Sequence, residues 1–187
     1  MAIVIVRHAT PKINYQRCNY KEAISRLTDY NLSKLVEEDE ISVDLIKENI
    51  DFKRDLDVLC SPKNRATLTH NIISNELKID KKVSIKDELD EIPLRIINIP
   101  LIRIKPTSWF LISRLKWIFS NYIKDKNKIN KKCKSIIDSI KENNNAIIIS
   151  HGFLRLFLRK ALKKDGYIRF KSYKSGCFCV EVWEYEK

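Results

Sequence analysis

An Arg-His pair follows a short apolar run near the start of the chain, and another histidine ends a similar run far downstream. The first run, residues 2–6, leads into Arg7 and His8, and the second, residues 146–150, leads into His151. Short runs of β-branched residues are typical of strands buried in a parallel sheet. Open α/β sheets bind ligands at the carboxyl ends of such strands. The two imidazoles and the guanidinium are therefore predicted to meet at one edge of a sheet.

The histidines also have a plain structural interpretation, because an isolated histidine is more often a hydrogen-bonded core side chain than a catalyst. Two of the three histidines follow similar strands, which weakens coincidence as an explanation. The third, His70, falls in a predicted helix and is interpreted as structural.

A third strand end adds a second arginine. The apolar run 56–60 is followed by Ser61, a residue type that caps helices, and by Pro62, which suits a first helical position. The first turn of such a helix offers free backbone N–H groups to an anion, and Arg65 projects from that turn. The alternative is an ordinary capped helix whose Arg65 faces water.

Strand and helix patterns alternate along the chain. Strands are predicted at residues 2–6, 56–60, 83–85, 146–150 and 178–185, and helices at 43–50, 63–77, 108–123, 128–141 and 153–162. This order predicts an α/β fold, a three-layer α/β/α sandwich with a mostly parallel central sheet. The strand at 178–185 alternates apolar and polar residues, which favours an edge strand with one face in water.

The composition narrows the class of protein. The chain has 187 residues, of which 44% are hydrophobic, and this suits a single domain over 1–187. No apolar stretch approaches the roughly 20 residues that span a bilayer, and no leader precedes Arg7, so a cytoplasmic protein is expected. The five cysteines lack CxxC spacing and indicate reduced thiols rather than a zinc site or disulfides. The three glycines form no phosphate-binding loop.

Lys and Arg number 36 against 24 acidic residues, a formal net charge of +12. This surplus attracts anions in general, including nucleic acid, acidic lipid headgroups and phosphorylated metabolites. No nucleic-acid-binding motif accompanies it, so the expected partner is a small phosphorylated substrate rather than nucleic acid. The oligomeric state is left open.

These segments together resemble the histidine phosphatase superfamily, which includes the phosphoglycerate mutases. The family's first strand ends in Arg-His-Gly and often has an Asn six residues beyond the histidine, and later blocks read Ser-Pro-x-x-Arg-Ala-x-x-Thr, Leu-x-Glu-Ile and His-Gly. The matching residues here are Arg7-His8-Ala9, Asn14, Ser61 to Thr69, Leu89 to Ile92, and His151-Gly152. The departures are Ala9 in place of glycine, Leu68 and His70 in place of Gln and Ala, and Pro93-Leu94-Arg95 in place of a glycine-containing stretch.

The resemblance implies a phosphoglycerate mutase-like fold and a phosphohistidine mechanism without metal or cofactor. His8 is then the nucleophile, and the groups that hold the phosphoryl oxygens are Arg7, Asn14, Arg65 and His151. Guanidinium groups match two phosphate oxygens at once and disfavour a protonated His8. The proton for the leaving group comes from Glu91, or from Glu88 if the register shifts.

The expected activity is hydrolysis of phosphomonoesters. A phosphoglycerate mutase-type phosphotransferase and a phosphohistidine-protein phosphatase are the enzymatic alternatives. A module that binds phosphate or polyanions without catalysis is the non-enzymatic one, although binding alone does not need both a nucleophile and an acid.

The stretch 92–123 is rich in aliphatic and aromatic residues interleaved with cations. One interpretation is a lid or insert over the active site, lined by Arg103 and Arg114. Its spacing also fits an amphipathic helix packed on the sheet. A membrane-surface helix or a dimer face is a third alternative.

Overall fold

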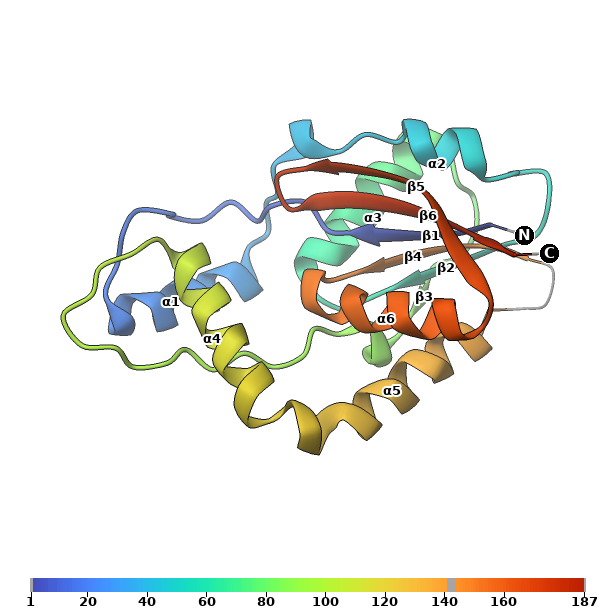
Figure 1. Ribbon diagram of the computed structural model, residues 1–187. Helices are drawn as coiled ribbons and strands as arrows, with labels where there is room; N and C mark the ends of the chain where they lie inside the picture. The colour runs from blue at the N-terminus through green and yellow to red at the C-terminus, as the bar shows by residue number, and fades with distance from the viewer. Residues whose placement is uncertain (1, 141–143, 187) are drawn as a thin grey trace.

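The computed structural model describes residues 2–140 and 144–186. Within them, one six-stranded sheet has the order β3-β2-β4-β1-β6-β5 (Figure 1). Its strands are β1 Ala2–Arg7, β2 Leu56–Cys60, β3 Ser84–Ile85, β4 Asn145–Ser150, β5 Tyr167–Ser175 and β6 Phe178–Tyr185. The first four are mutually parallel and β6 runs antiparallel to both β1 and β5. The predicted mostly parallel sheet is confirmed, and β5 is a strand that the sequence analysis missed.

Six α-helices connect and cover the strands within the described residues. They are α1 Tyr20–Leu32, α2 Asp44–Asn49, α3 Asn64–Leu77, α4 Pro106–Ser120, α5 Tyr122–Asp138 and α6 Gly152–Lys164, with short 3-10 helices at Glu38–Glu40 and Asp87–Leu89. All five predicted helices are present, although the predicted end at Lys141 lies outside the described residues. None of the helices described is both long enough and apolar enough to cross a bilayer.

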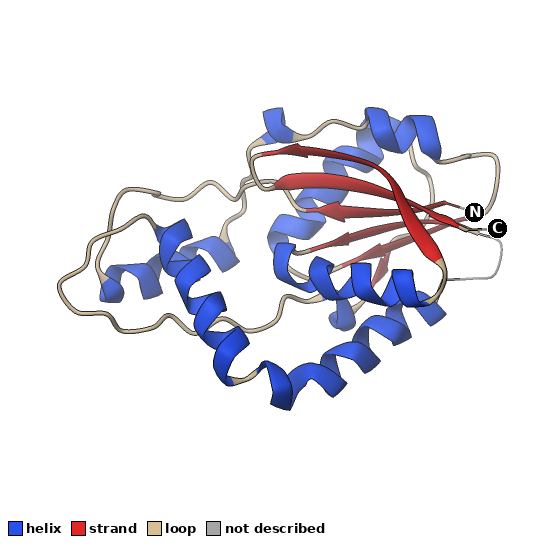
Figure 2. Cartoon of the chain, in the orientation of Figure 1, coloured by secondary structure: helices blue, strands red, loops and turns tan. Residues whose placement is uncertain are grey.

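The β-branched runs are buried on both faces of the sheet. In β1, Val4 and Val6 pack in a cluster with α2 and α3, whereas Ile3 and Ile5 pack in a second cluster with α5 and α6. This alternation follows from the two-residue period of a strand. The clusters make the three-layer α/β/α sandwich that the sequence predicts (Figure 2).

The prediction that the last strand is an edge strand is wrong. β6 lies between β1 and β5, and its Glu181 is fully buried. Arg155, Arg159 and Arg169 surround this carboxylate. Burial alone would raise the pKa of Glu181, but the hydrogen bond from Arg159 and the neighbouring positive charges hold it below its ordinary value. Glu181 therefore interrupts the apolar pattern of β6 because it pairs with arginines, and not because that face of the strand is in contact with water.

Helices α1 and α4 lie beyond the carboxyl ends of the parallel strands (Figure 1). They share a small cluster of their own, in which fully buried Trp109 of α4 packs with Ala23 of α1. The Trp109 indole donates to the carbonyl of Cys18, 2.9 Å away. Helix α4 therefore packs mainly on α1 and α5, and the expectation that this helix packs directly on the sheet is wrong. Ile92 and Trp117, at either end of the stretch 92–123, contact the core cluster that contains β1 and β4.

Candidate active site

The parallel register of β1 and β4 brings two distant histidines together. Arg7 pairs with Ser150, so His8 and His151 follow at the same edge of the sheet. The His8 amide donates to the Ser150 carbonyl at 3.1 Å, and the two imidazole centroids are 5.0 Å apart. Both rings are buried.

A backbone hydrogen bond orients the ring of His8. Its Nδ1 lies 2.8 Å from the carbonyl oxygen of Ala9, which can only accept, so Nδ1 carries the proton in the neutral ring. Nε2 therefore carries no proton, and its lone pair accepts a hydrogen bond from Arg65 Nε at 3.1 Å. This tautomer makes Nε2 the nucleophilic atom.

The electrostatic environment keeps both histidines neutral. Burial, followed by the positive charges of Arg65 and Arg7, holds the pKa of His8 well below its ordinary value. Burial, the adjacent His8 and Arg65 likewise lower the pKa of His151. A neutral imidazole is the state that nucleophilic attack requires.

Arg65 is held in place by helix α1. Its Nη1 donates to Asn31 Oδ1 at 3.1 Å, and its guanidinium carbon lies 4.9 Å from the centroid of the Tyr30 ring. The Tyr30 ring in turn contacts His8 edge to face, with centroids 6.1 Å apart. Tyr30 and Asn31 are site residues that the sequence analysis missed. The one sequence signal for their helix is the capping box formed by Asn19 and Glu22.

Ser61 contacts His151 instead of capping a helix. Its Oγ lies 2.8 Å from His151 Nε2, and α3 begins only at Asn64, after an N-cap at Lys63. The predicted helix start at Pro62 is therefore wrong. The buried Nδ1 of His151 has no hydrogen-bond partner in the described part of the chain.

Arg7 lies against the start of α6. A Cβ on Gly152 would lie 2.8 Å from Arg7 Nε, so glycine leaves the room that the guanidinium needs. Arg7 Nη2 is 3.3 Å from Cys177 Sγ, while its buried Nε has no hydrogen-bond partner among residues 2–140 and 144–186. A buried polar atom of this kind calls for an explanation, and a bound anion supplies one.

The structure brings Glu91, rather than Glu88, to the site. The Glu91 carboxylate accepts from the amides of Phe153 and Leu154, at 3.2 and 3.1 Å, in the first turn of α6. Arg114 Nη2 lies 3.9 Å from Glu91 Oε1. Glu88 is exposed and does not line the cavity described next.

A cavity of about 340 Å³ lies over these groups. The sheet edge and the loops that follow it contribute Arg7, His8, Arg65 and Glu91 to its lining. Leu27, Tyr30, Asn31, Phe110 and Arg114, from α1 and α4, form the opposite wall. Three guanidinium groups, those of Arg7, Arg65 and Arg114, and a neutral nucleophile around one cavity suit a tetrahedral oxyanion.

Three residues singled out in the sequence lie elsewhere. Asn14 is exposed, its Oδ1 accepts from the amide of Gln16, and it does not line the cavity. Arg103 is also exposed and pairs with Glu22 on α1. His70 hydrogen-bonds to its neighbours on α3, in keeping with its structural interpretation.

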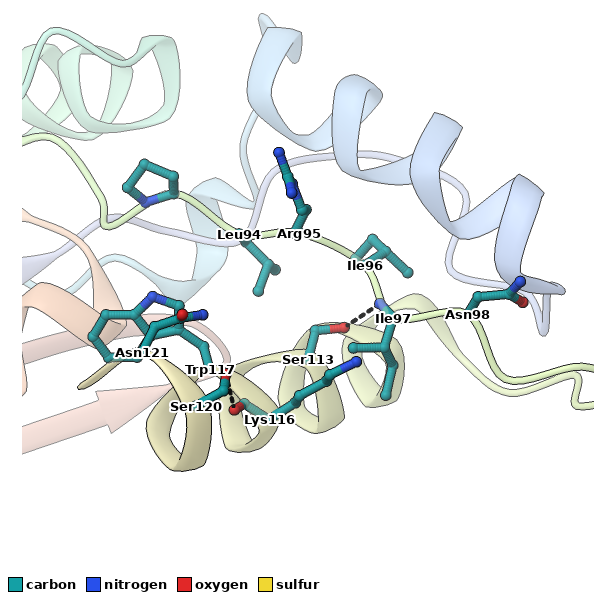
Figure 3. Close-up of a pocket in the computed structure, with 11 residues that line it drawn as sticks. Leu94, Arg95, Ile96, Ile97, Asn98, Ser113, Lys116, Trp117, Ser120 and Asn121 are labelled. Atoms are coloured by element: carbon teal, nitrogen blue, oxygen red, sulfur yellow. Dashed lines mark hydrogen bonds between the residues drawn. The ribbon is translucent and has the colours of Figure 1, made fainter. Parts of the chain in front are cut away.

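A second cavity of about 540 Å³ lies between residues 93–98 and α4 (Figure 3). It shares Pro93 and Leu94 with the first, and Ser113 accepts a hydrogen bond there from the Ile97 amide. Histidine and carboxylate side chains are absent from its lining. The smaller cavity therefore holds the groups for phosphoryl chemistry.

Across the described residues, no cluster of three or more His, Cys, Asp or Glu is placed to hold a metal ion.

Comparison with solved structures identifies related folds. A phosphoserine phosphatase from Entamoeba histolytica, in complex with 3-phosphoglyceric acid, is 20% identical over 87% of this chain and 80% of its own, with a TM-score of 0.51. A Plasmodium falciparum phosphoglycerate mutase is 24% identical over 87% of this chain and 75% of its own, with a TM-score of 0.42. At 20% identity the likeness to the Entamoeba phosphatase shows the fold alone. No curated protein sequence matches the chain.

The model of the histidine phosphatase superfamily (branch 1) matches residues 3–187, which is nearly the whole chain. The match includes all the strand ends that surround the cavity. The chain belongs to the histidine phosphatase superfamily, branch 1.

Proposed function

We propose that this protein hydrolyses phosphomonoesters through a covalent phosphohistidine formed at Nε2 of His8. The observation that carries the proposal is the orientation of that ring, whose Nδ1 is tied to the Ala9 carbonyl while Nε2 meets Arg65. The Nε2 lone pair attacks phosphorus, the bond from phosphorus to the leaving oxygen breaks, and the resulting alkoxide takes a proton.

The surrounding groups can neutralise the phosphoryl charge. Arg7 and Arg65 offer forked donors to the equatorial oxygens. When the Ser61 hydroxyl donates to Nε2 of His151, Nδ1 of that ring carries the proton. The ring packs beside His8 and is not part of the cavity lining, so we propose that Nδ1 meets the phosphoryl oxygens only once substrate is bound. Because these side chains supply the positive charge, we propose that the reaction needs no metal ion.

Glu91 is the proposed acid and base. As a carboxylic acid it gives its proton to the leaving oxygen, and as a carboxylate it then takes one from the attacking water. Water forms a new bond to phosphorus, the bond to His8 Nε2 breaks, and phosphate is released.

A panel of phosphomonoesters assayed with EDTA tests this function and the role of Glu91. The panel pairs nitrophenyl phosphate with alkyl phosphates, including phosphoserine and 3-phosphoglycerate, the compounds associated with the Entamoeba structure. We expect the wild type to release phosphate from members of the panel. Glu91→Gln should slow alkyl phosphates by about 10²-fold or more but nitrophenyl phosphate by less than about tenfold, because nitrophenolate leaves without a proton.

Glu88→Gln is the matched control, since Glu88 is exposed and outside the cavity. It should leave both rates unchanged. If Glu91→Gln slowed both ester classes equally, the proposed acid role would be rejected. Glu91 would then serve only to accept hydrogen bonds from the first turn of α6. Absence of hydrolysis across the panel, or strict dependence on a metal ion, would contradict the proposed function.

We further propose one domain over 1–187, in which residues 92–123, together with α1, act as a lid that selects the substrate. Phe110 and Arg114 reach the cavity from this segment, whereas Arg103 does not. Arg114→Ala should therefore raise KM by about tenfold, the usual scale for one charge-assisted contact, while Arg103→Ala leaves it unchanged. Steady-state kinetics on the best panel substrate check this. Equal KM values for wild type and Arg114→Ala would reject the lid contact.

A further inference from the structure

The positive charge of this protein is concentrated in one segment. Residues 92–137 carry eleven Lys or Arg and a single acidic residue, Asp125, whereas the rest of the chain carries 25 Lys or Arg against 23 Asp or Glu. Nearly all of the net charge of +12 thus belongs to α4, α5 and the loop before them. The active-site cavity takes Arg114 from this set, so most of the surplus lies outside the catalytic machinery.

The outer face of α4 is apolar and exposed. Leu111, Leu115, Ile118 and Phe119 follow the i, i+4, i+7, i+8 spacing of one helix face, and their exposed fractions are 61%, 45%, 38% and 86%. The opposite face of the helix carries Trp109, which packs toward α1. Core packing therefore does not account for the outer apolar face.

The junction of α4 and α5 forms a projecting corner at the lower edge of the molecule (Figure 1). Phe119 and Ile123 stand on either side of this junction and are 86% and 87% exposed. Lys124, Lys126 and Lys128 follow within two turns and form no ion pair with a described residue. The corner thus presents two exposed apolar side chains, followed in sequence by three lysines without an ion pair among the described residues.

We propose that this corner docks on an anionic membrane surface, with Phe119 and Ile123 entering the interface and the lysines meeting lipid phosphates. Interfacial helices combine an exposed apolar face with Lys and Arg in this way. Each lysine near an anionic leaflet adds to the attraction. The docking is peripheral and involves no membrane span.

Two other occupants fit the observations less well. A second copy of the chain, related by twofold symmetry, would set the lysine-rich corner against the same lysines. RNA would satisfy the lysines through its phosphates but would gain little from exposed Ile and Leu side chains. The combination of aliphatic residues and lysines favours a lipid surface.

Vesicle flotation with the full chain tests the proposal, using phosphatidylcholine vesicles with and without phosphatidylglycerol. We expect binding to the anionic vesicles alone, weakened by salt. Phe119→Ser/Ile123→Ser should weaken it by about tenfold or more. Lys124→Gln/Lys128→Gln should weaken it by about fivefold for each lysine. Both variants should keep wild-type hydrolysis of a soluble phosphomonoester, because none of the four residues lines the active-site cavity.

Matched controls come from other surfaces of the molecule. Ile168→Ser/Phe170→Ser replaces the same residue types on the edge strand β5, where they are 45% and 55% exposed, and should bind as the wild type does. The proposal is overturned by absence of binding, by equal binding to neutral vesicles, or by full binding of Phe119→Ser/Ile123→Ser. A dimer that this variant dissociates, or binding to RNA with no binding to vesicles, would also overturn it. Vesicle binding is measured without turnover, so its result tests the docking proposal independently of the phosphatase activity.

Discussion

Replacing His8 with alanine is expected to lower kcat by about 10⁴-fold or more on every substrate of the enzyme. The reason is that the variant loses the atom that attacks phosphorus, and losing a nucleophile costs this much in enzymes with covalent intermediates. His151 does not take over the role, because its ring is fully buried and, unlike that of His8, does not line the cavity. Steady-state turnover of the best panel substrate measures the loss.

Asn14→Ala is the informative control for this variant. The resemblance to the family gives Asn14 a role in binding the phosphoryl group, but the residue is exposed and outside the cavity. We therefore expect wild-type kinetics from Asn14→Ala. Turnover by His8→Ala within about tenfold of wild type would reject covalent catalysis by this residue.

Arg65→Lys is expected to lower kcat/KM by about 10²-fold to 10³-fold, the usual cost of removing one donor to a developing oxyanion. Lysine keeps the charge but lacks the fork that reaches His8 Nε2 and Asn31 together. It also loses the stacking on Tyr30. Kinetics near wild type for Arg65→Lys would show that charge alone suffices.

Arg65→Ala should also change the titration of His8. The positive charge of Arg65 helps hold the pKa of His8 below its ordinary value, so removing that charge makes protonation easier and raises the pKa. The neutral nucleophile is then lost at a higher pH as the solution is acidified. NMR of the His8 ring nitrogens measures the shift, and an unchanged pKa would reject the electrostatic coupling.

The sheet, and the site residues at its carboxyl edge, could be predicted because local sequence patterns determine them. β-Branched runs indicate buried strands, and parallel strands place their carboxyl ends at one edge. His8 and His151 could therefore be placed together from the residues that precede them. The family resemblance singled out Glu91, and the first turn of α6 shows what holds its carboxylate.

The part of the site that α1 contributes depends on contacts between segments far apart in sequence. Helix α1 is mostly polar, and its contributions, Tyr30 and Asn31, matter only because α1 lies over Arg65. Similarly, Glu181 looks solvated in an alternating strand until arginines from α6 and β5 are placed around it. Periodicity reports burial along one element, but it does not report which distant charge an element meets.

Mapping the phosphorylated atom is the most direct test of the central claim. The wild-type enzyme would be mixed with substrate, quenched at alkaline pH to preserve the acid-labile phosphohistidine, and digested for mass spectrometry and NMR. We predict phosphate on Nε2 of His8, formed and lost at rates that match turnover, because Nδ1 is engaged with Ala9. Phosphate on Nδ1 or on another residue, or turnover without any phosphoenzyme, would contradict the mechanism.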